Sequence, residues 1–161
     1  MPIYMKFEGI DGNVSAQHYK NWIELQSFGN GLSRNVQTVV GAAGEREAGQ
    51  PSFTEVTITK EQDLSTGNLL RECVANTKGK KVEIDFVATD EQVWMKIELE
   101  KVIITQQSLA ATGETSHGGM LETYSLSFAK IVYVPRMRHS SGTRVENPRR
   151  IGYDLATAKP F

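Results

Sequence analysis

Few side chains in this sequence have the types and the spacing that metal binding or covalent chemistry requires. The three histidines, His18, His117 and His139, lie in polar, turn-like stretches, and none has a second ligand at metal-binding spacing. The single cysteine, Cys73, excludes an intramolecular disulfide and a zinc site built from several cysteines. Because a free cysteine usually behaves as a small buried apolar residue, we expect Cys73 in the core, and we expect neither metal nor cofactor.

The motifs of nucleophilic catalysis and of phosphate binding are also missing. The sequence contains no Gly-x-Ser-x-Gly, the motif of an exposed serine nucleophile. Gly41 and Gly44 are not followed by the Gly-Lys-Ser/Thr of a phosphate-binding loop. Glu45 and Glu47 could pair as carboxylates, but a polar loop does not hold two carboxylates in a fixed geometry, and Arg46 lies between them. The sequence therefore predicts a protein that is not an enzyme.

The length and composition are those of one globular domain. The 161 residues fall within the usual ~100–200 residues of a domain, and 39% hydrophobic with 23% charged residues excludes a disordered or collagen-like chain. The net charge of −1 lacks the basic excess of a general nucleic-acid binder. No apolar run approaches the ~20 residues of a membrane helix. Residues 1–6 lack the apolar core of a signal peptide, so we expect a cytoplasmic chain without membrane insertion.

Charge is distributed unevenly along the chain. Residues 130–161 contain seven basic and two acidic side chains, a net charge of +5, so residues 1–129 carry −6. The basic side chains include Arg136, Arg138, Arg149 and Arg150. Opposite charges at the two ends of one domain favour head-to-tail contact between copies, although a solvated basic tail would give the same pattern.

Alternating apolar and polar residues predict the elements that position these side chains, and most of them are strands. About eight strands are expected, at residues 3–7, 22–28, 32–40, 53–60, 82–86, 92–105, 121–134 and 151–155. Within 92–105 the pattern changes from one apolar face to the continuous Val102-Ile103-Ile104, which indicates a strand that leaves one sheet and enters another. Leu126, Phe128, Val132 and Val134 indicate one face of a single long strand over 121–134.

One helix and two glycine-rich stretches complete the pattern. Leu69, Leu70, Cys73, Val74 and Thr77 recur every three or four residues, which predicts a helix near residues 64–78, capped by Asp63 or Ser65 and ended by Gly79. Gly29 and Gly31 indicate a bulge or bend within the strand region. The polar stretch 41–51 has no periodicity and predicts an exposed loop. The fold class is mainly β: an antiparallel β-barrel of two packed sheets with one α-helix.

Read in order, several of these segments resemble the Hcp family, the tube protein of the bacterial type VI secretion system. The similar segments are residues 3–12, Trp22-Ile-Glu-Leu with the glycine-interrupted strand after it, residues 53–60, 63–70, 99–104 and 121–130, and Gly152-Tyr-Asp-Leu155. Each segment alone is a weak signal, and their common order is a strong one. The resemblance covers nearly the whole chain, so it implies a single Hcp-like tube domain over residues 1–161 with no appended effector domain.

The resemblance implies a structural function. It implies a barrel like that of phage tail tubes, hexameric rings that stack, a contractile sheath around them, a spike trimer at the tip and secreted effectors in the lumen. It also implies a chain that is cytoplasmic before assembly and is then secreted without a signal peptide. Lumen-facing candidates are Ser27, Gly29, Gly31 and Ser33, on a strand where many relatives have an aromatic residue at the position of Asn30. Candidates for the loop between subunits and rings are Gly41, Gly44, Glu45, Arg46, Glu47 and Gly49, and basic candidates for ring stacking are Arg136, Arg138, Arg149 and Arg150.

Two other functions remain open at this point. A phage tail-tube subunit would have the same barrel, and neighbouring genes for capsid rather than sheath proteins would identify it. A small β-sandwich that binds a ligand, such as a sugar, would be monomeric with a pocket lined by Trp22 or Trp94. Because tryptophan buries much apolar area, core or interface packing explains both tryptophans more simply.

Overall fold

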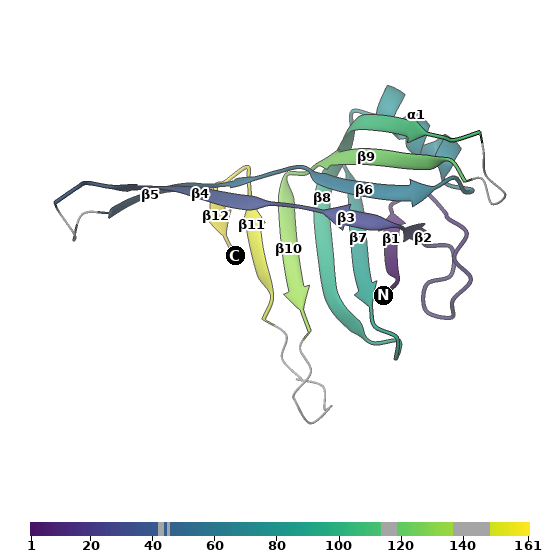
Figure 1. Ribbon diagram of the computed structural model, residues 1–161, viewed down its shortest axis with the longest axis horizontal. Helices are drawn as coiled ribbons and strands as arrows, with labels where there is room; N and C mark the ends of the chain where they lie inside the picture. Colours follow the sequence, from purple (N-terminus) through teal and green to yellow (C-terminus); the bar gives the residue numbers. More distant parts are fainter. Residues whose placement is uncertain (42–43, 45, 114–118, 137–148) are drawn as a thin grey trace.

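The computed structural model describes residues 1–41, 44, 46–113, 119–136 and 149–161. These residues form twelve strands, β1 to β12, and one helix, α1. The protein is therefore mainly β with antiparallel sheets, as the sequence predicts (Figure 1). Twelve strands rather than about eight are present because the predicted strands 22–28 and 121–134 are each divided in two, and because the strands at residues 46–53 and 159–160 were not predicted.

Seven strands form the first sheet, in the order β12-β11-β10-β8-β7-β1-β2. Their bounds are β1 Ile3–Phe7, β2 Ile23–Leu25, β7 Lys80–Val87, β8 Val93–Ala110, β10 Lys130–Pro135, β11 Ile151–Asp154 and β12 Lys159–Pro160. Every pairing is antiparallel. The second sheet consists of β3 Ser27–Gly29, β6 Val56–Glu61, β9 Leu121–Ser127 and the second half of β8. Figure 1 shows β3, β6 and β9 running across the strands of the first sheet, which is the orthogonal type of sheet packing.

Strand β8 belongs to both sheets and forms a corner between them. Its first half pairs with β7 and β10, and from Ile103 onward it pairs with β9. The change lies within the apolar run from which the sequence predicted it. Lys101 has a φ of 55° at this corner, and Gly79 lies against it, because a Cβ on Gly79 would overlap the Lys101 Cα and lie 2.7 Å from its carbonyl carbon.

The chain also changes sheets at Gln26, and this forms the second corner. Strand β2 pairs with β1 in the first sheet and β3 pairs with β6 in the second. Between them, the Gln26 amide donates a hydrogen bond to the Thr59 carbonyl at 2.7 Å. Among the described strands, the two sheets meet at these corners rather than forming one closed hydrogen-bonded cylinder.

The single strand predicted over residues 121–134 is wrong, because two strands of different sheets replace it. Strand β9 pairs with β6 and β8 in the second sheet, and β10 pairs with β8 and β11 in the first. The chain turns at Ala129, whose amide donates to the Glu100 carbonyl at 3.1 Å. At this turn the alternation of core-facing residues shifts by one position. After Phe128, the next residue of the core cluster is therefore Ile131 rather than Val132.

The core lies between the two sheets. Its fully buried side chains come from β1, β2, β6, β7, β8, β9, β10 and α1, and they include Met5, Phe7, Ile23, Ile58, Leu69, Ile84, Leu99, Tyr124, Leu126 and Ile131. Cys73 is half-buried and packs against this cluster from the helix. Burial of these apolar side chains is the main stabilising contribution to the subunit.

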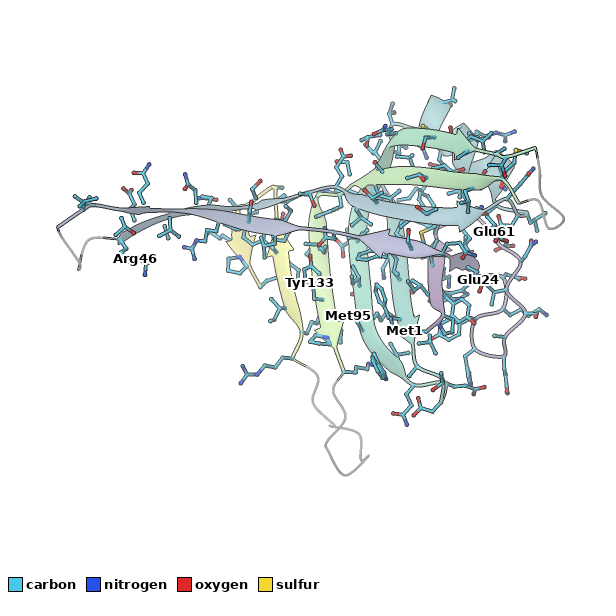
Figure 2. The ribbon with its side chains drawn as sticks, in the orientation of Figure 1. Met1, Glu24, Arg46, Glu61, Met95 and Tyr133 are labelled. Atoms are coloured by element: carbon cyan, nitrogen blue, oxygen red, sulfur yellow. The ribbon has the colours of Figure 1, made fainter. Side chains whose placement is uncertain are left out.

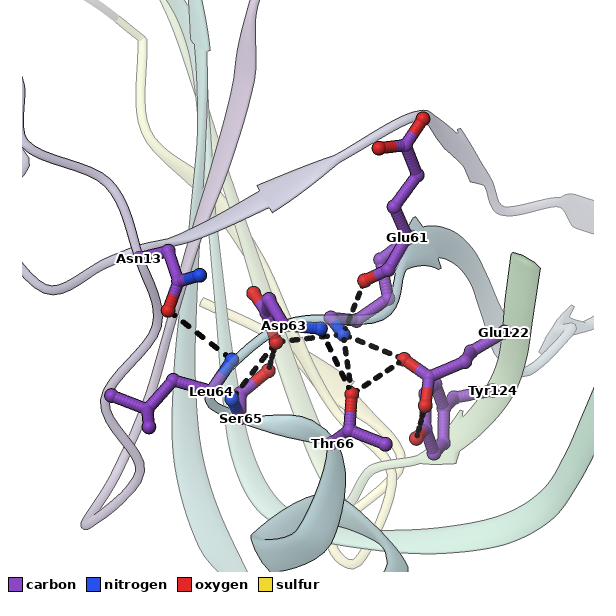
Figure 3. Close-up of polar contacts among 9 residues, drawn as sticks. Asn13, Glu61, Asp63, Leu64, Ser65, Thr66, Glu122 and Tyr124 are labelled. Carbon is purple, nitrogen blue, oxygen red and sulfur yellow. Dashed lines mark hydrogen bonds and ion pairs between the residues drawn. The ribbon is translucent and has the colours of Figure 1, made fainter. Parts of the chain in front are cut away.

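The helix is shorter than predicted and is held by a polar cluster at its start. α1 spans Thr66–Ala75, and Asn76 rather than Gly79 ends it. Ser65 is the N-cap residue but makes no side-chain cap bond; instead the carboxylate of Asp63 accepts from both the amide and the hydroxyl of Ser65. The buried ammonium of Lys60 lies 2.9 Å from the Asp63 carboxylate, and Figure 3 shows Asp63, Ser65 and Thr66 together in this turn.

Strands β4 Leu32–Thr38 and β5 Arg46–Phe53 form a separate two-stranded hairpin, here called the arm. Figure 1 shows the arm extending away from the two sheets, on the side opposite to α1. The loop predicted over 41–51 is therefore wrong for residues 46–51, which are a strand paired with β4. Their glycine, glutamine and proline content hides this strand, because the pairing with β4 rather than local propensity produces it.

Candidate self-association surfaces

The arm presents apolar side chains to solvent. Every residue of β4 is exposed. Val40 is 100% exposed, and Leu32, Val36 and Val39 are also largely exposed. Since β4 and β5 pair only with each other among the described strands, each also has a free hydrogen-bonding edge. Exposed apolar groups beside unpaired strand edges are typical of a surface that another protein chain covers.

The residues predicted for a loop between subunits lie on the arm, with one outside the described residues. Gly41 and Gly44 lie near its tip and are exposed. Arg46 pairs with Thr38 and Glu47 with Gln37 in the strand register, and Gly49 lies farther along β5. Figure 2 shows Arg46 at the distal part of the arm. Glu45 lies outside the described residues.

The four predicted lumen residues lie along the chain from β3 into the arm. Ser27 and Gly29 are exposed on β3, while Phe28 between them points into the core and contacts Phe86 with ring centroids 5.1 Å apart. Gly31 is half-buried in the link to the arm, and Ser33 is exposed on β4. Ser27 and Gly29 therefore share one face of the second sheet, and Ser33 belongs to the arm.

The exposed face of the second sheet is uniformly small and polar around Ser27 and Gly29. The register aligns Ser27 with Thr59 and Thr123, and it aligns Gly29 with Thr57 and Ser125. The hydroxyls of Thr59 and Thr123 are 3.4 Å apart. Sequence reasoning did not single out these threonines and serines. They alternate with apolar residues in 56–60 and 122–126, and this pattern indicates that they share the exposed face of their strands.

The basic residues predicted for ring stacking lie in different environments. Arg149 and Arg150 are exposed, and an Arg150 terminal nitrogen is 3.4 Å from the Glu98 carboxylate. Arg136 is half-buried, its amide donates to the Trp94 carbonyl at 2.7 Å, and its Nε has no partner in the described part of the chain. Arg138 lies outside the described residues. Arg149 and Arg150 are thus accessible to another copy, and Arg136 is held at the edge of β10.

A buried acid lies under an aromatic loop on the outer side of the first sheet. The Asp85 side chain accepts a hydrogen bond from the Tyr19 hydroxyl at 3.0 Å. Tyr19 also contacts the rings of Tyr4 and Trp22. Burial raises the pKa of Asp85 above its ordinary value, while the Tyr19 hydrogen bond and the charges of Lys96 and Arg136 oppose that rise. Burial and the Asp85 charge raise the pKa of Tyr19, so its hydroxyl remains a donor.

The described residues contain no cluster of three or more side chains that could hold a metal ion. His18 is exposed, and His117 and His139 lie outside the described residues. Trp22 is half-buried against Tyr19, and Trp94 is 53% exposed on β8. Within the part of the chain that the structure describes, no helix has the length and hydropathy to cross a membrane.

Comparison with known proteins identifies a family from the sequence and a shared fold from the structure. A family model described as "Type VI secretion system effector, Hcp" matches residues 4–134. A solved structure described as a type six secretion system protein has a TM-score of 0.90 at 18% identity, covering 99% of each chain. Hcp1 from Salmonella typhimurium has a TM-score of 0.78 at 20% identity, covering 99% of this chain and 98% of its own.

A type VI secretion system effector from Yersinia pestis is similar over 94% of this chain and 98% of its own, with a TM-score of 0.70 at 21% identity. No curated protein matches the sequence. At these identities the solved structures show the fold, and the family model, which covers most of the chain, shows the family. The chain belongs to the Hcp family of the type VI secretion system.

Proposed function

We propose that this chain is the subunit of a type VI secretion inner tube, in which six copies form a ring and rings stack around a common lumen. The observation that carries the proposal is the arm, which extends exposed apolar side chains and free strand edges away from a body that has its own core. A single domain over residues 1–161 is part of the proposal, and so is the absence of catalytic activity.

The position of the arm suits head-to-tail association. A ring closes when one surface of each copy meets a different surface of the next copy around a rotation axis. The arm lies on one side of the body and α1 lies on the other side (Figure 1). The arm of one copy can therefore contact a surface of the next copy that is not the arm of that copy. Residues 32–41 and 46–53 would contact adjacent subunits and rings, which buries their apolar side chains.

The exposed face of the second sheet is the proposed lumen wall. It carries Ser27, Gly29, Thr57, Thr59 and Thr123, which are small and uncharged. Effectors would pass along this face, the sheath would surround the outside of the tube, and a spike trimer would close its tip. The chain would be cytoplasmic during assembly and secreted when the sheath contracts.

Electron microscopy of the purified protein, combined with arm variants, tests this function. We expect rings with six copies and a central opening. Val36→Asp together with Val40→Asp places charges on the arm and should abolish rings. Below the concentration at which the wild type assembles, the unfolding midpoint should stay within about 2 °C of the wild type, because both positions are solvent-exposed in the subunit.

Val74→Asp is the control for the arm variants, since Val74 is also exposed but lies on α1, away from the arm. It should leave the rings intact. Monomers of the wild-type protein at every concentration, or rings that survive both charges on the arm, would contradict the proposed function.

A further inference from the structure

The arm is joined to the body through two short links, here called the root: Asn30 and Gly31 before β4, and Thr54 and Glu55 after β5. The Asn30 side-chain amide donates to the Thr54 carbonyl at 3.2 Å. The Gly31 amide donates to the Thr54 hydroxyl at 2.7 Å, and the Thr54 amide donates back to the Gly31 carbonyl at 2.9 Å. The two links are therefore bonded to each other at the point where the arm leaves the body.

Tyr133 connects the root to the opposite sheet. It lies on β10 in the first sheet, its ring packs against the core, and its hydroxyl donates to the Asn30 side-chain oxygen. Burial raises the pKa of Tyr133, so the hydroxyl stays protonated and remains a donor. Figure 2 shows Tyr133 beneath the region where β3 continues into β4. Asn30 thus uses both ends of its side-chain amide, one toward Thr54 and one toward Tyr133.

A second contact supports the other leg of the arm. The Phe53 ring, at the end of β5, lies 5.1 Å from the Tyr153 ring and 6.3 Å from the Phe128 ring. The Tyr153 hydroxyl is 3.4 Å from the Gln50 side-chain oxygen. Beyond these contacts the arm is exposed along β4 and most of β5. A small rotation at the root would therefore displace the tip by a large distance.

We propose that Asn30, Thr54 and Tyr133 form a clamp that sets the direction of the arm and so prepares the subunit for assembly. Asn30 is the positioning residue at its centre, and the clamp holds the arm of the free subunit near the direction that it needs against a neighbouring copy. A prepositioned arm loses less conformational entropy on association, which strengthens binding without any new contact. The proposal deepens the proposed function and rests on it for the assembly that the clamp would promote.

The position of Asn30 also explains a departure from the family pattern noted in the sequence. A phenylalanine at this position could make neither of these hydrogen bonds, and a tryptophan could donate but not accept. In this chain the side chain at position 30 therefore belongs to the root of the arm, and Ser27 and Gly29 alone represent this segment on the exposed face of the second sheet.

Two isosteric substitutions remove clamp hydrogen bonds with little change in volume. Thr54→Val removes the hydroxyl that Gly31 uses, and Tyr133→Phe removes the donor to Asn30. We expect each to raise the concentration for half-assembly, measured by sedimentation velocity, by about tenfold. Below that concentration, the arm amides of residues 33–38, 46–50 and 52 should exchange with deuterium several-fold faster than in the wild type.

Matched controls separate positioning from stability. Thr54→Ser keeps the hydroxyl and should assemble like the wild type. Tyr19→Phe removes another tyrosine hydrogen bond, to Asp85 on the outer side of the first sheet, and should lower the unfolding midpoint by an amount similar to Tyr133→Phe without changing assembly. If Tyr133 had only a structural role, two variants with the same loss of stability would assemble equally well. A loss of assembly in Tyr133→Phe but not in Tyr19→Phe therefore indicates positioning.

The outcomes distinguish this inference from the proposed function. Suppose that the wild type assembles, and that Thr54→Val and Tyr133→Phe assemble at the same concentration as the wild type with unchanged exchange of the arm amides. This result would refute the clamp, but it would not refute the tube function. If the wild type never assembles, the tube function is refuted. In that case, faster exchange of the arm amides in the two variants would still support a clamp, and unchanged exchange would refute it.

Discussion

Asp85 is a buried acid whose second side-chain oxygen has no hydrogen-bond partner among the described residues. Its side chain is packed beneath the loop that carries Tyr19, and Lys96, Arg136 and Glu83 are the charged groups that act on it. Burial dominates, so the folded protein holds a proton on Asp85 more tightly than the unfolded chain does. The contribution of Asp85 to stability is therefore favourable at low pH and is lost as the pH rises through its raised pKa.

Replacing Asp85 by Asn should make this pH dependence visible. Asparagine cannot ionise, so the free energy of unfolding of Asp85→Asn relative to the wild type should increase as the pH rises from the ordinary aspartate pKa through the raised pKa of Asp85, and should then level off. Urea unfolding at several pH values measures it, with Asp11→Asn, on an exposed residue, as the control. A difference between variant and wild type that is constant with pH, or that falls as the pH rises, would refute the raised pKa.

Lys60 and Glu122 form an ion pair that is fully buried between β6, β9 and the start of α1. The Lys60 ammonium lies 2.7 Å from the Glu122 carboxylate and 2.9 Å from Asp63, and it also donates to the Glu61 carbonyl at 2.8 Å. The Thr66 hydroxyl donates to the same Glu122 carboxylate at 3.1 Å (Figure 3). Because Glu122 is fully buried and Lys60 is the cation beside it, removing Lys60 alone is costlier than removing both charges.

Lys60→Met should destabilise the subunit by about 3–5 kcal/mol, since it leaves the Glu122 carboxylate buried without its cation. Adding Glu122→Gln removes that charge and keeps acceptor and donor groups for Thr66 and Tyr124, so the double variant should recover most of the loss. Chemical denaturation of the four proteins of the double-mutant cycle measures the coupling. Additive effects of the two substitutions would show that the pair does not act as a unit.

At the scale of elements, the corner of β8 determines how the two sheets meet. Gly79 allows the chain before β7 to lie against the backbone of Lys101, where β8 bends from one sheet into the other. The contact is with backbone atoms that cannot move without shifting β8. A side chain at position 79 would therefore force the corner apart.

Gly79→Ala should destabilise the subunit by at least about 2 kcal/mol, because overpacking against a backbone has no cheap relief. Gly67→Ala is the matched control. Gly67 lies in the first turn of α1 with open space around its Cβ position, so alanine there should stabilise the subunit by about 0.5–1 kcal/mol. Thermal unfolding of both variants checks the two signs, and a tolerated Gly79→Ala would mean that the corner is not tightly packed.

These elements also show what the sequence could and could not predict. The change of sheet within β8 was predicted because it alters the local pattern at Val102-Ile103-Ile104. The break between β9 and β10 was missed, although a phase shift from Phe128 to Ile131 marks it, because Val132 is buried too and continues the apparent alternation. Strand β5 was missed because Gly49 and Pro51 are poor strand formers, and Pro51 is tolerated on a strand with a free edge.

For the candidate surfaces, the sequence shows which residues are neighbours along the chain. It does not show which residues of different strands lie side by side. It singled out Ser27 and Gly29, yet the neighbouring hydroxyls of Thr57, Thr59 and Thr123 come from strands whose register only the fold determines. Similarly, Asn30 could be noticed as a departure from the family pattern, but its partner Tyr133 lies 103 positions away on the other sheet.

The whole molecule carries its charge unevenly, and this predicts how the proposed rings would stack. Residues 130–161 carry +5 and residues 1–129 carry −6, and Arg149 and Arg150 are exposed. If opposite charges meet between rings, stacking should weaken as salt rises, since the screening length falls from about 8 Å at 0.15 M to about 3 Å at 1 M. Sedimentation at these two salt concentrations measures the stacking. Stacking that is equally strong at both concentrations would exclude an attraction between opposite charges of neighbouring rings.

The solution mass of the purified protein at micromolar concentration tests the central claim most directly, by light scattering after size exclusion. The account predicts a mass near six times the 17.9 kDa of one chain, with the exposed arm of each copy covered by its neighbours. A mass of one chain at every concentration would contradict it, because the arm would then remain uncovered, and a monomeric binding module would become the better description.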